Sequence, residues 1–285
     1  MDLCDIHQIK ALLGRHGFRF SKSMGQNFLI ADWVPREIAK ASGAHRDAGV
    51  LEIGPGIGCL TQELAGRAGK VVSVELDRSL LPILKETLAG RDNVEIVSGD
   101  ILKLDIRQMT LKMPWLSGFA ACANLPYNIT TPAITALIEA KCFFAITVMI
   151  QKEVAQRICA RPGSKDYGAF SIYCQYYTAP ELLFEVPPDC FIPAPKVTSA
   201  VVRLVPRPAP AEVDDPDHFF RVVKAAFALR RKTLVNSLLA SLSGQLSREE
   251  ISMAVEQCGL PPDVRGERLS IPQFAQLSRA LRGLV

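Results

Sequence analysis

The chain has 285 residues, of which 48% are hydrophobic and 22% charged, and its formal net charge at pH 7 is +4. This apolar share excludes a largely disordered chain, and the length allows one large domain beside a smaller one. The mild positive charge permits a nucleic-acid partner without requiring one.

Eight cysteines are spread along the chain, and none belongs to a C-x-x-C pair. The four histidines do not lie at metal-ligand spacing beside them, so we expect no metal. Several cysteines fall inside apolar runs, which suggests buried reduced thiols and a cytoplasmic protein. The N-terminus lacks an apolar signal-peptide core, and the longest apolar run, Cys142–Ile150, is too short for a membrane span, so we expect no membrane partner.

The first 50 residues predict two helices, at 5–16 and 33–41, with Asp32 as N-cap of the second. After them, apolar strands alternate with helices. The expected strands are 49–53, 70–75, 94–97, 119–123 and 143–150, and the expected helices are 60–68, 78–88 and 131–140. Such alternation indicates right-handed βαβ crossovers and a parallel sheet, and the nearly continuous apolar strands suit a sheet covered on both faces.

Two further strands are expected at 182–186 and 200–204. The Pro/Ala/acidic stretch Pro206–Pro216 then predicts a linker, which divides the chain into domains 1–207 and 208–285. The second domain is predicted to be helical, with helices at 218–229, 233–242, 248–258 and 271–282. Ser247 and Glu250 form a capping box before the third of these helices.

A glycine-rich loop follows the first strand of the alternating pattern, with Gly54, Gly56 and Gly58 in G-x-G-x-G spacing. Ligands of open parallel sheets bind beyond the carboxyl ends of the strands, where glycines allow close backbone approach. The simpler alternative is a tight turn that closes a βα unit. Two acids at later strand ends favour a ligand site: Glu75 suits the hydroxyls of a ribose, and Asp100 suits an adenine amino group. Either acid can instead be a solvated side chain or a helix cap, and for Asp100 alone that interpretation is the simpler one.

The charges around this loop favour S-adenosylmethionine as the cofactor. Glu52 precedes the glycines, and no lysine or arginine lies between Glu52 and Gly66 to neutralise a phosphate. An acid there would repel a pyrophosphate but tolerate a sulfonium. The loop also lacks the G-x-G-x-x-G spacing of dinucleotide sites and the lysine of a P-loop.

The turn Asn124-Leu125-Pro126-Tyr127 follows another strand at the same edge of the sheet. An adenine amino nitrogen is a poor nucleophile because its lone pair is delocalised into the ring. The Asn124 side-chain oxygen and the carbonyl of Leu125 or Pro126 can accept its two N–H bonds and aim the lone pair, while Tyr127 stacks on the base. Phe191, in a proline-rich segment, is a candidate for the second stacking face; the alternatives are an ordinary Asn/Pro turn and a core phenylalanine.

Taken together, these motifs resemble the ribosomal RNA adenine N6-dimethyltransferase family along essentially the whole chain. The resemblance rests on Gln26-Asn27-Phe28-Leu29, LEIGPGIGCLT, VELD, Ser98-Gly99-Asp100, NLPY and FIPAPKV, and the C-terminal Arg265–Ser270 resembles the small-subunit branch. It implies an α/β fold, with a Rossmann-like seven-stranded class I methyltransferase sheet and a small C-terminal helical domain. It also implies dimethylation of two adjacent adenosines in the 3′-terminal hairpin of 16S rRNA during small-subunit maturation.

By position, the resemblance places Asn27, Leu29, Gly54, Glu75, Asp100 and Asn124 at the cofactor; for Asn27 and Leu29 it is the only reason. The implied partner is 16S rRNA in an immature 30S subunit, and we expect a monomer. Candidate RNA contacts are Arg15, Arg19 and Lys22 near the N-terminus and Arg230-Arg231-Lys232, although each can be a solvated charge instead. Two other functions stay open: a non-catalytic ribosome-assembly factor and a DNA adenine methyltransferase.

Overall fold

The computed structural model describes residues 1–21, 24–242 and 244–283. Its contacts divide the chain into two units: Met1–Ala155 with Glu181–Pro206, and Gln156–Pro180 with Arg207–Val285. We expected residues 156–180 in the first domain, whereas here they group with the helical unit. The reason is packing, because Ile172 and Tyr176 belong to the same buried apolar cluster as the C-terminal helices.

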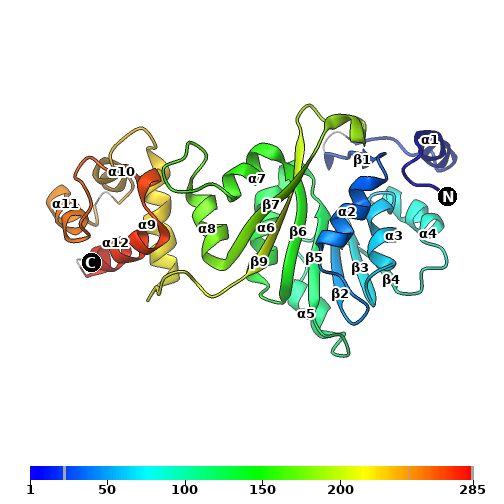
Figure 1. Cartoon of the computed structure of the whole chain (residues 1–285), viewed down its shortest axis with the longest axis horizontal. Coiled ribbons are helices and arrows are strands. Elements are labelled where there is room, and N and C mark those ends of the chain that lie inside the picture. The colour runs from blue at the N-terminus through cyan, green and yellow to red at the C-terminus, as the bar shows by residue number, and fades with distance from the viewer. Residues whose placement is uncertain (22–23, 243, 284–285) are drawn as a thin grey trace. The chain divides into compact units, whose positions relative to one another are not determined.

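The first unit is built on a seven-stranded sheet with the order β4-β3-β2-β5-β6-β9-β7, drawn in Figure 1. Its strands are β2 (Gly49–Ile53), β3 (Lys70–Glu75), β4 (Val94–Ser98), β5 (Phe119–Asn124), β6 (Phe143–Gln151), β7 (Thr178–Val186) and β9 (Ser199–Pro206). The pairs among β4, β3, β2, β5 and β6 are parallel, whereas β9 runs antiparallel to β6. The expected seven-stranded class I methyltransferase fold, with helices after the sheet, is thereby confirmed.

Helices cover the sheet on both faces. The helices of this unit are α1 (Ile6–Arg15), α2 (Trp33–Ala41), α3 (Cys59–Ala65), α4 (Leu81–Thr87), α5 (Ile106–Leu111) and α6 (Thr130–Glu139), and α7 (Lys152–Ile158) spans the boundary with the helical unit. Helices α2 and α3 share one buried cluster with Val50 and Val71 of the strands. Leu51 and Val72 point the opposite way and are buried too, as a sheet enclosed by crossover helices requires.

Two short elements lie beside the main sheet and were not predicted. Strands β1 (Phe28–Leu29) and β8 (Phe191–Ile192) form a two-stranded antiparallel sheet, in which Leu29 pairs with Phe191.

Asp32 does not make the expected cap to α2, because its own backbone is helical; its carboxylate instead accepts a hydrogen bond from Arg36.

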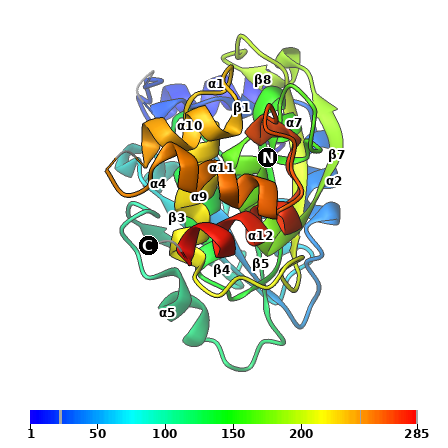
Figure 2. The same ribbon diagram turned by 90° about the vertical axis from the view of Figure 1, so that its left-hand side faces the viewer.

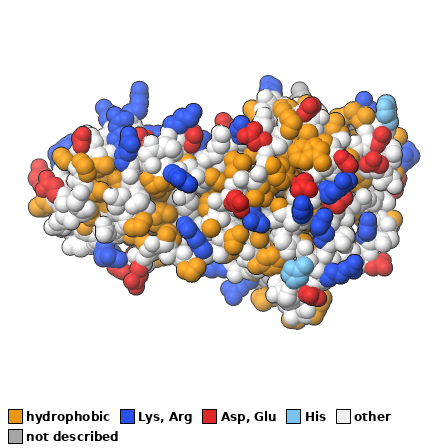
Figure 3. Space-filling model, viewed as in Figure 1, with side chains coloured by type: hydrophobic (Ala, Val, Ile, Leu, Met, Phe, Trp, Pro, Cys, Tyr) orange, Lys and Arg blue, Asp and Glu red, His pale blue; other side chains and the backbone are white. Residues whose placement is uncertain are grey.

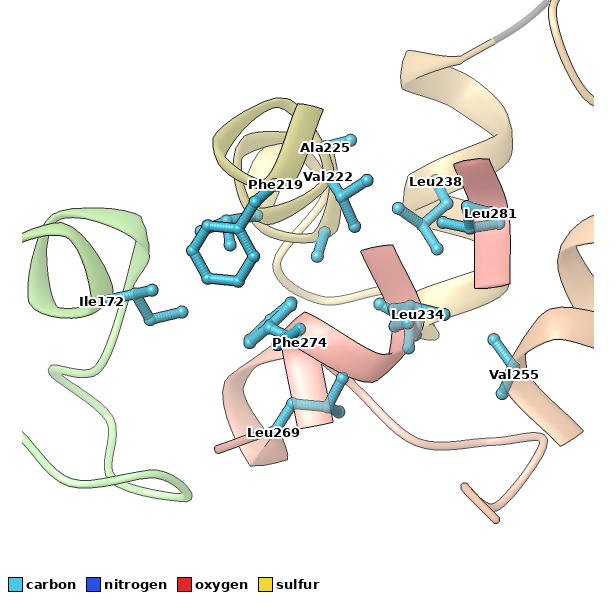
Figure 4. Close-up of a cluster of buried hydrophobic side chains, with 14 of the residues drawn as sticks. Ile172, Phe219, Val222, Ala225, Leu234, Leu238, Val255, Leu269, Phe274 and Leu281 are labelled. Carbon is cyan, nitrogen blue, oxygen red and sulfur yellow. The ribbon is translucent and has the colours of Figure 1, made fainter. Parts of the chain in front are cut away.

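The helical unit has its own apolar core. It contains α8 (Ala169–Tyr177), α9 (Pro216–Ala228), α10 (Leu234–Ser241), α11 (Arg248–Gln257) and α12 (Ile271–Arg282), and Figure 2 shows the last four packed around one another. Figure 4 shows Ile172, Phe219 and Phe274 turned toward one another in this core, and all three are fully buried. The capping box of Ser247 and Glu250 is present at the start of α11, as predicted. In the described part of the chain, no helix combines the length and the apolar character that a membrane span needs.

Candidate functional site

A cavity of about 240 Å³ opens where the carboxyl ends of the parallel strands meet. One water requires roughly 10–15 Å³ on this scale, so the space suits a small molecule. All eleven predicted site residues line this one cavity: Asn27, Leu29, Gly54, Gly56, Glu75, Asp100, Asn124, Leu125, Pro126, Tyr127 and Phe191. The topology therefore brings together residues that the sequence separates by as many as 164 positions (191 − 27).

The glycine turn after β2 adopts a backbone that other residues rarely accept. Gly54, Gly56 and Gly58 have φ values of +68°, +60° and +95°. A Cβ on Gly54 would meet no protein atom within 4 Å, so the space that it would fill belongs to the cavity. A Cβ on Gly56 would lie 3.3 Å from the Phe28 ring. The turn thus forms a cradle that only glycine leaves open.

Glu75, at the end of β3, is held in place by backbone donors. Its Oε1 accepts the Asp77 N–H at 2.8 Å, and its Oε2 accepts the Gly56 N–H at 3.3 Å. Its side chain is 6% exposed, and this burial raises the pKa of the carboxyl above its ordinary value. The carboxylate therefore has a fixed orientation beside the glycine turn, and each oxygen retains a lone pair for a hydroxyl donor.

Asp100 lies two residues beyond β4 and both lines the cavity and shapes its own turn. One carboxylate oxygen accepts the Leu102 N–H at 3.0 Å, and the other lies 3.8 Å from Lys103 Nζ. The carboxylate therefore closes a local turn, rather than capping a helix, the alternative considered from the sequence. This turn does not compete with a ligand contact, because a carboxylate has about four acceptor positions.

The Asn124 carboxamide is oriented by the N-terminal segment. Its Nδ2 donates to the Asn27 carbonyl oxygen at 3.3 Å, across 97 residues of sequence. The acceptor is a carbonyl, so the NH₂ end must face it and the side-chain oxygen remains to accept elsewhere. Asn124 is the last residue of β5, which fixes its backbone.

The two candidate carbonyls of the turn differ in their availability. The Pro126 oxygen already accepts the Ile129 N–H at 3.2 Å and the Thr130 hydroxyl at 3.4 Å. Leu125 has its N–H bonded to Met149, and no protein donor to its carbonyl is found among the described residues. The geometry favours Leu125 over Pro126 as the second acceptor for an amino group.

Contacts with neighbouring strands fix both aromatic residues of the site, Tyr127 and Phe191. The Tyr127 hydroxyl shares a hydrogen bond of 2.8 Å with Ser199 Oγ, and burial raises the pKa of the phenol. Phe191 is only 4% exposed and belongs to a buried apolar cluster, so the core position considered as the alternative is present, although the residue also lines the cavity. The pairing of β8 with β1 holds its backbone. Ser199 carried no sequence signal for this contact, because only the position of β9 brings it to Tyr127.

The structure corrects the electrostatic argument that rested on Glu52. This residue is fully buried away from the cavity, and its Oε2 accepts hydrogen bonds from Thr61 at 2.7 Å and Ser73 at 2.6 Å. The charge of the cavity comes instead from the residues that line it. Its described residues include the acids Glu75 and Asp100 but no lysine or arginine. An acidic cavity suits adenosine and a sulfonium cation and disfavours a pyrophosphate.

Among the candidate RNA contacts, Arg19 is exposed, and Arg15 and Arg230 keep 51% and 47% of their side chains exposed although each has an ion-pair partner. Arg15 pairs with Glu86, and Arg230 pairs with Glu267, so both have structural partners. Arg231 and Lys232 are exposed, and Figure 3 shows lysine and arginine side chains gathered over the helical unit at the left of the view. Lys22 lies outside the described residues.

A family model and curated relatives both match this chain over nearly its whole length. A family model described as ribosomal RNA adenine dimethylase matches residues 17–280. Ribosomal RNA small subunit methyltransferase A of Geobacillus thermodenitrificans is 47% identical, covering 99% of this chain and 98% of the relative. The protein of the same name from Streptococcus pneumoniae is 46% identical, covering 99% of each chain.

Solved structures show the same fold over most of the chain. The crystal structure of the 23S rRNA methyltransferase ErmE is 28% identical with a TM-score of 0.67, over 90% of this chain and 99% of that one. A dimethyladenosine transferase from Plasmodium falciparum has a TM-score of 0.73 at 24% identity, over 87% of this chain and 95% of that one, and supports the fold alone. From the match of residues 17–280 and the identity along the whole length, the chain belongs to the ribosomal RNA adenine dimethylase family.

Proposed function

We propose that this protein dimethylates N6 of two adjacent adenosines in the 3′-terminal hairpin of 16S rRNA, with S-adenosylmethionine as the methyl donor. The observation that carries the proposal is a single cavity lined by the glycine turn, Glu75, Asp100 and Asn124. The identity of 47% to a small-subunit methyltransferase, against 28% to the 23S rRNA enzyme, supports the small-subunit substrate.

We assign each group of cavity residues to a different part of the cofactor. We assign the ribose hydroxyls to Glu75, the adenine amino group of the cofactor to Asp100, and close backbone approach to Gly54 and Gly56. Asn27 and Leu29 cover the same space from the N-terminal side. S-adenosylmethionine, when bound, supplies a methyl group activated by attachment to a sulfonium.

The target adenine needs its amino lone pair aimed at that methyl group. The oxygens of Asn124 and Leu125 accept its two N–H bonds, which favours a pyramidal nitrogen, while Tyr127 and Phe191 support the base. The N6 lone pair forms the new N–C bond, the electrons of the methyl–sulfur bond stay on sulfur, and N6 then releases a proton to water. The described lining offers no strong general base, so the rate enhancement comes from orientation and local electrostatics.

The base must leave its stack or loop to reach this edge of the sheet.

We assign phosphate contacts to the exposed Arg19, Arg231 and Lys232. We propose an immature 30S subunit as the physiological substrate. The enzyme that modifies it is monomeric and acts in the cytoplasm. We keep 1–207 and 208–285 as the proposed sequence limits of the catalytic and helical parts, with residues 156–180 packing into the helical core. An assembly-factor role without catalysis is disfavoured because the glycine turn and the Asn124 turn are both intact and line the cavity.

The test is transfer of tritiated methyl groups to 30S subunits that lack the modification, with 50S subunits as the control substrate, followed by mapping of the modified nucleotides. We expect incorporation at adjacent adenosines of 16S rRNA only. Asn124→Ala should lower the rate about a hundredfold because the amino group is no longer aimed, while cofactor affinity falls by less than about fivefold. Absence of incorporation by folded, cofactor-binding protein would refute the proposal.

A further inference from the structure

The N-terminal segment Met24–Leu29 lines the cavity. It lies beside both the glycine turn and the turn that begins at Asn124. The Phe28 ring lies 3.3 Å from the position that a Cβ on Gly56 would take, and Pro126 lies 3.6 Å from the position that a Cβ on Gly25 would take. This segment also supplies the Asn27 carbonyl that orients Asn124. Its position therefore affects the aim of the catalytic carboxamide.

Gln26 connects this segment to the turn that follows Glu75. Its Nε2 donates to Asp77 Oδ2 at 2.6 Å, and its Oε1 accepts the Ser21 N–H at 3.0 Å. Both ends of the carboxamide are thus engaged by partners of fixed polarity. A flipped amide would place an oxygen against the carboxylate and an NH₂ against an N–H, so only one orientation satisfies both contacts.

Asp77 is a firm attachment point for this carboxamide. Its Oδ1 accepts the Ser79 N–H at 2.9 Å and the Ser79 hydroxyl at 2.6 Å. Its backbone N–H donates to Glu75 Oε1, so the attachment point and the proposed ribose ligand belong to one turn. A hydrogen bond to an ionised acceptor is also stronger than one between neutral groups.

We propose that Gln26 is a positioning residue, whose carboxamide fastens the Met24–Leu29 segment to Asp77 and so holds the Asn27 carbonyl where it orients Asn124. The inference rests on the proposed function and extends it to a residue that lines the cavity but is assigned no contact with a reacting atom. Hydrogen bonds connect Glu75 to Asp77, Asp77 to Gln26, and Asn27 to Asn124, and the backbone joins Gln26 to Asn27.

The polarity of the contact permits a test by exchange. Gln26→Glu sets two carboxylates against each other, and Asp77→Asn sets two NH₂ groups against each other. In the double variant, the amide introduced at position 77 donates to the carboxylate introduced at position 26. That carboxylate still accepts the Ser21 N–H, and the oxygen of the new amide still accepts from Ser79.

We expect each single variant to lower the single-turnover methyl-transfer rate at saturating cofactor by about tenfold, and the KM for 30S subunits to change by less than about threefold. The double variant should return to within about threefold of the wild-type rate, because the exchange restores a donor facing an acceptor.

Gln108→Glu, on the exposed start of α5, is the matched control for the charge and should behave like wild type. A second measurement, amide hydrogen exchange of Phe28 and Leu29, follows the segment independently of activity: protection should fall in both single variants and return in the double variant. Single variants within twofold of wild type in rate and protection, or a double variant with additive losses, would overturn the inference. A wild-type protein that transfers no methyl group would count against the proposed function instead, and the exchange data would still decide the role of Gln26.

Discussion

At the residue scale, Glu52 is a fully buried carboxyl group on β2, two residues before Gly54 of the glycine turn. It belongs to a row of polar residues that pair across neighbouring strands, with Ser73 on β3 and Cys122 on β5 as its register partners. Burial raises the pKa of Glu52 to about 7, although the hydrogen bonds from Ser73 and Thr61 act in the opposite direction. Its Oε1 has no hydrogen-bond partner among the residues that the structure describes, which adds to the cost of ionising it in the fold.

This environment predicts a pH dependence of stability that Glu52→Gln removes. Between its ordinary pKa near 4.5 and the folded value of about 7, the native protein holds a proton that the unfolded chain has released. Stability must therefore fall as pH rises through this window and level off above it, by up to about 3 kcal/mol. Urea unfolding from pH 4.5 to pH 8 should show a smaller decline in the free energy of unfolding for Glu52→Gln than for wild type. Parallel curves would show that Glu52 is not the group responsible.

At the scale of elements, the apolar periodicity of the sequence and its turn-forming residues predicted the regular strands and helices. The apolar strands β2 and β3 were predicted at their observed limits, as were helices α2 and α12. Helices α5, α7 and α8 were missed, the first two being only six and seven residues long and the third rich in aromatic residues. The antiparallel direction of β9 was also unpredicted, because strand direction depends on the path of the intervening chain rather than on the local pattern.

The glycine turn permits a matched comparison of strain and space. Gly54 and Gly90 both have positive φ, +68° and +79°, and a Cβ on either meets no atom within 4 Å. Alanine at each position should cost about 1 kcal/mol of stability through backbone strain alone. Only Gly54→Ala places a methyl group in the cavity, so it should weaken S-adenosylmethionine binding by at least about tenfold in calorimetry. Equal affinities for the two variants would remove the glycine turn from the cofactor site.

At the scale of the whole molecule, the sequence located the strand-end residues of the site but not the contacts that support them. Glu75 and Asn124 were predicted together because parallel strands end at a common edge. The hydrogen bonds of Gln26 to Asp77 and of Tyr127 to Ser199 join residues 51 and 72 positions apart, and no local pattern encodes such distances. The helical unit was predicted as a domain from its linker, whereas the inclusion of residues 156–180 depends on packing alone.

The separate core of the helical unit predicts that it can be loosened without loss of the cofactor site. A Cβ on Gly266 would lie 2.7 Å from the Ala226 carbonyl oxygen of α9, a backbone contact that cannot yield without moving the helix. Gly266→Ala should therefore cost about 1–3 kcal/mol through overpacking, and hydrogen exchange should accelerate in α9, α10 and α12. Cofactor affinity should stay within twofold of wild type, because every described residue of the cavity belongs to the first unit. Gly283→Ala is the control in the same unit, since its Cβ would lie 3.7 Å from the nearest atom, the Ala280 carbonyl oxygen. A parallel loss of cofactor binding in Gly266→Ala would mean that the two cores lose their structure together.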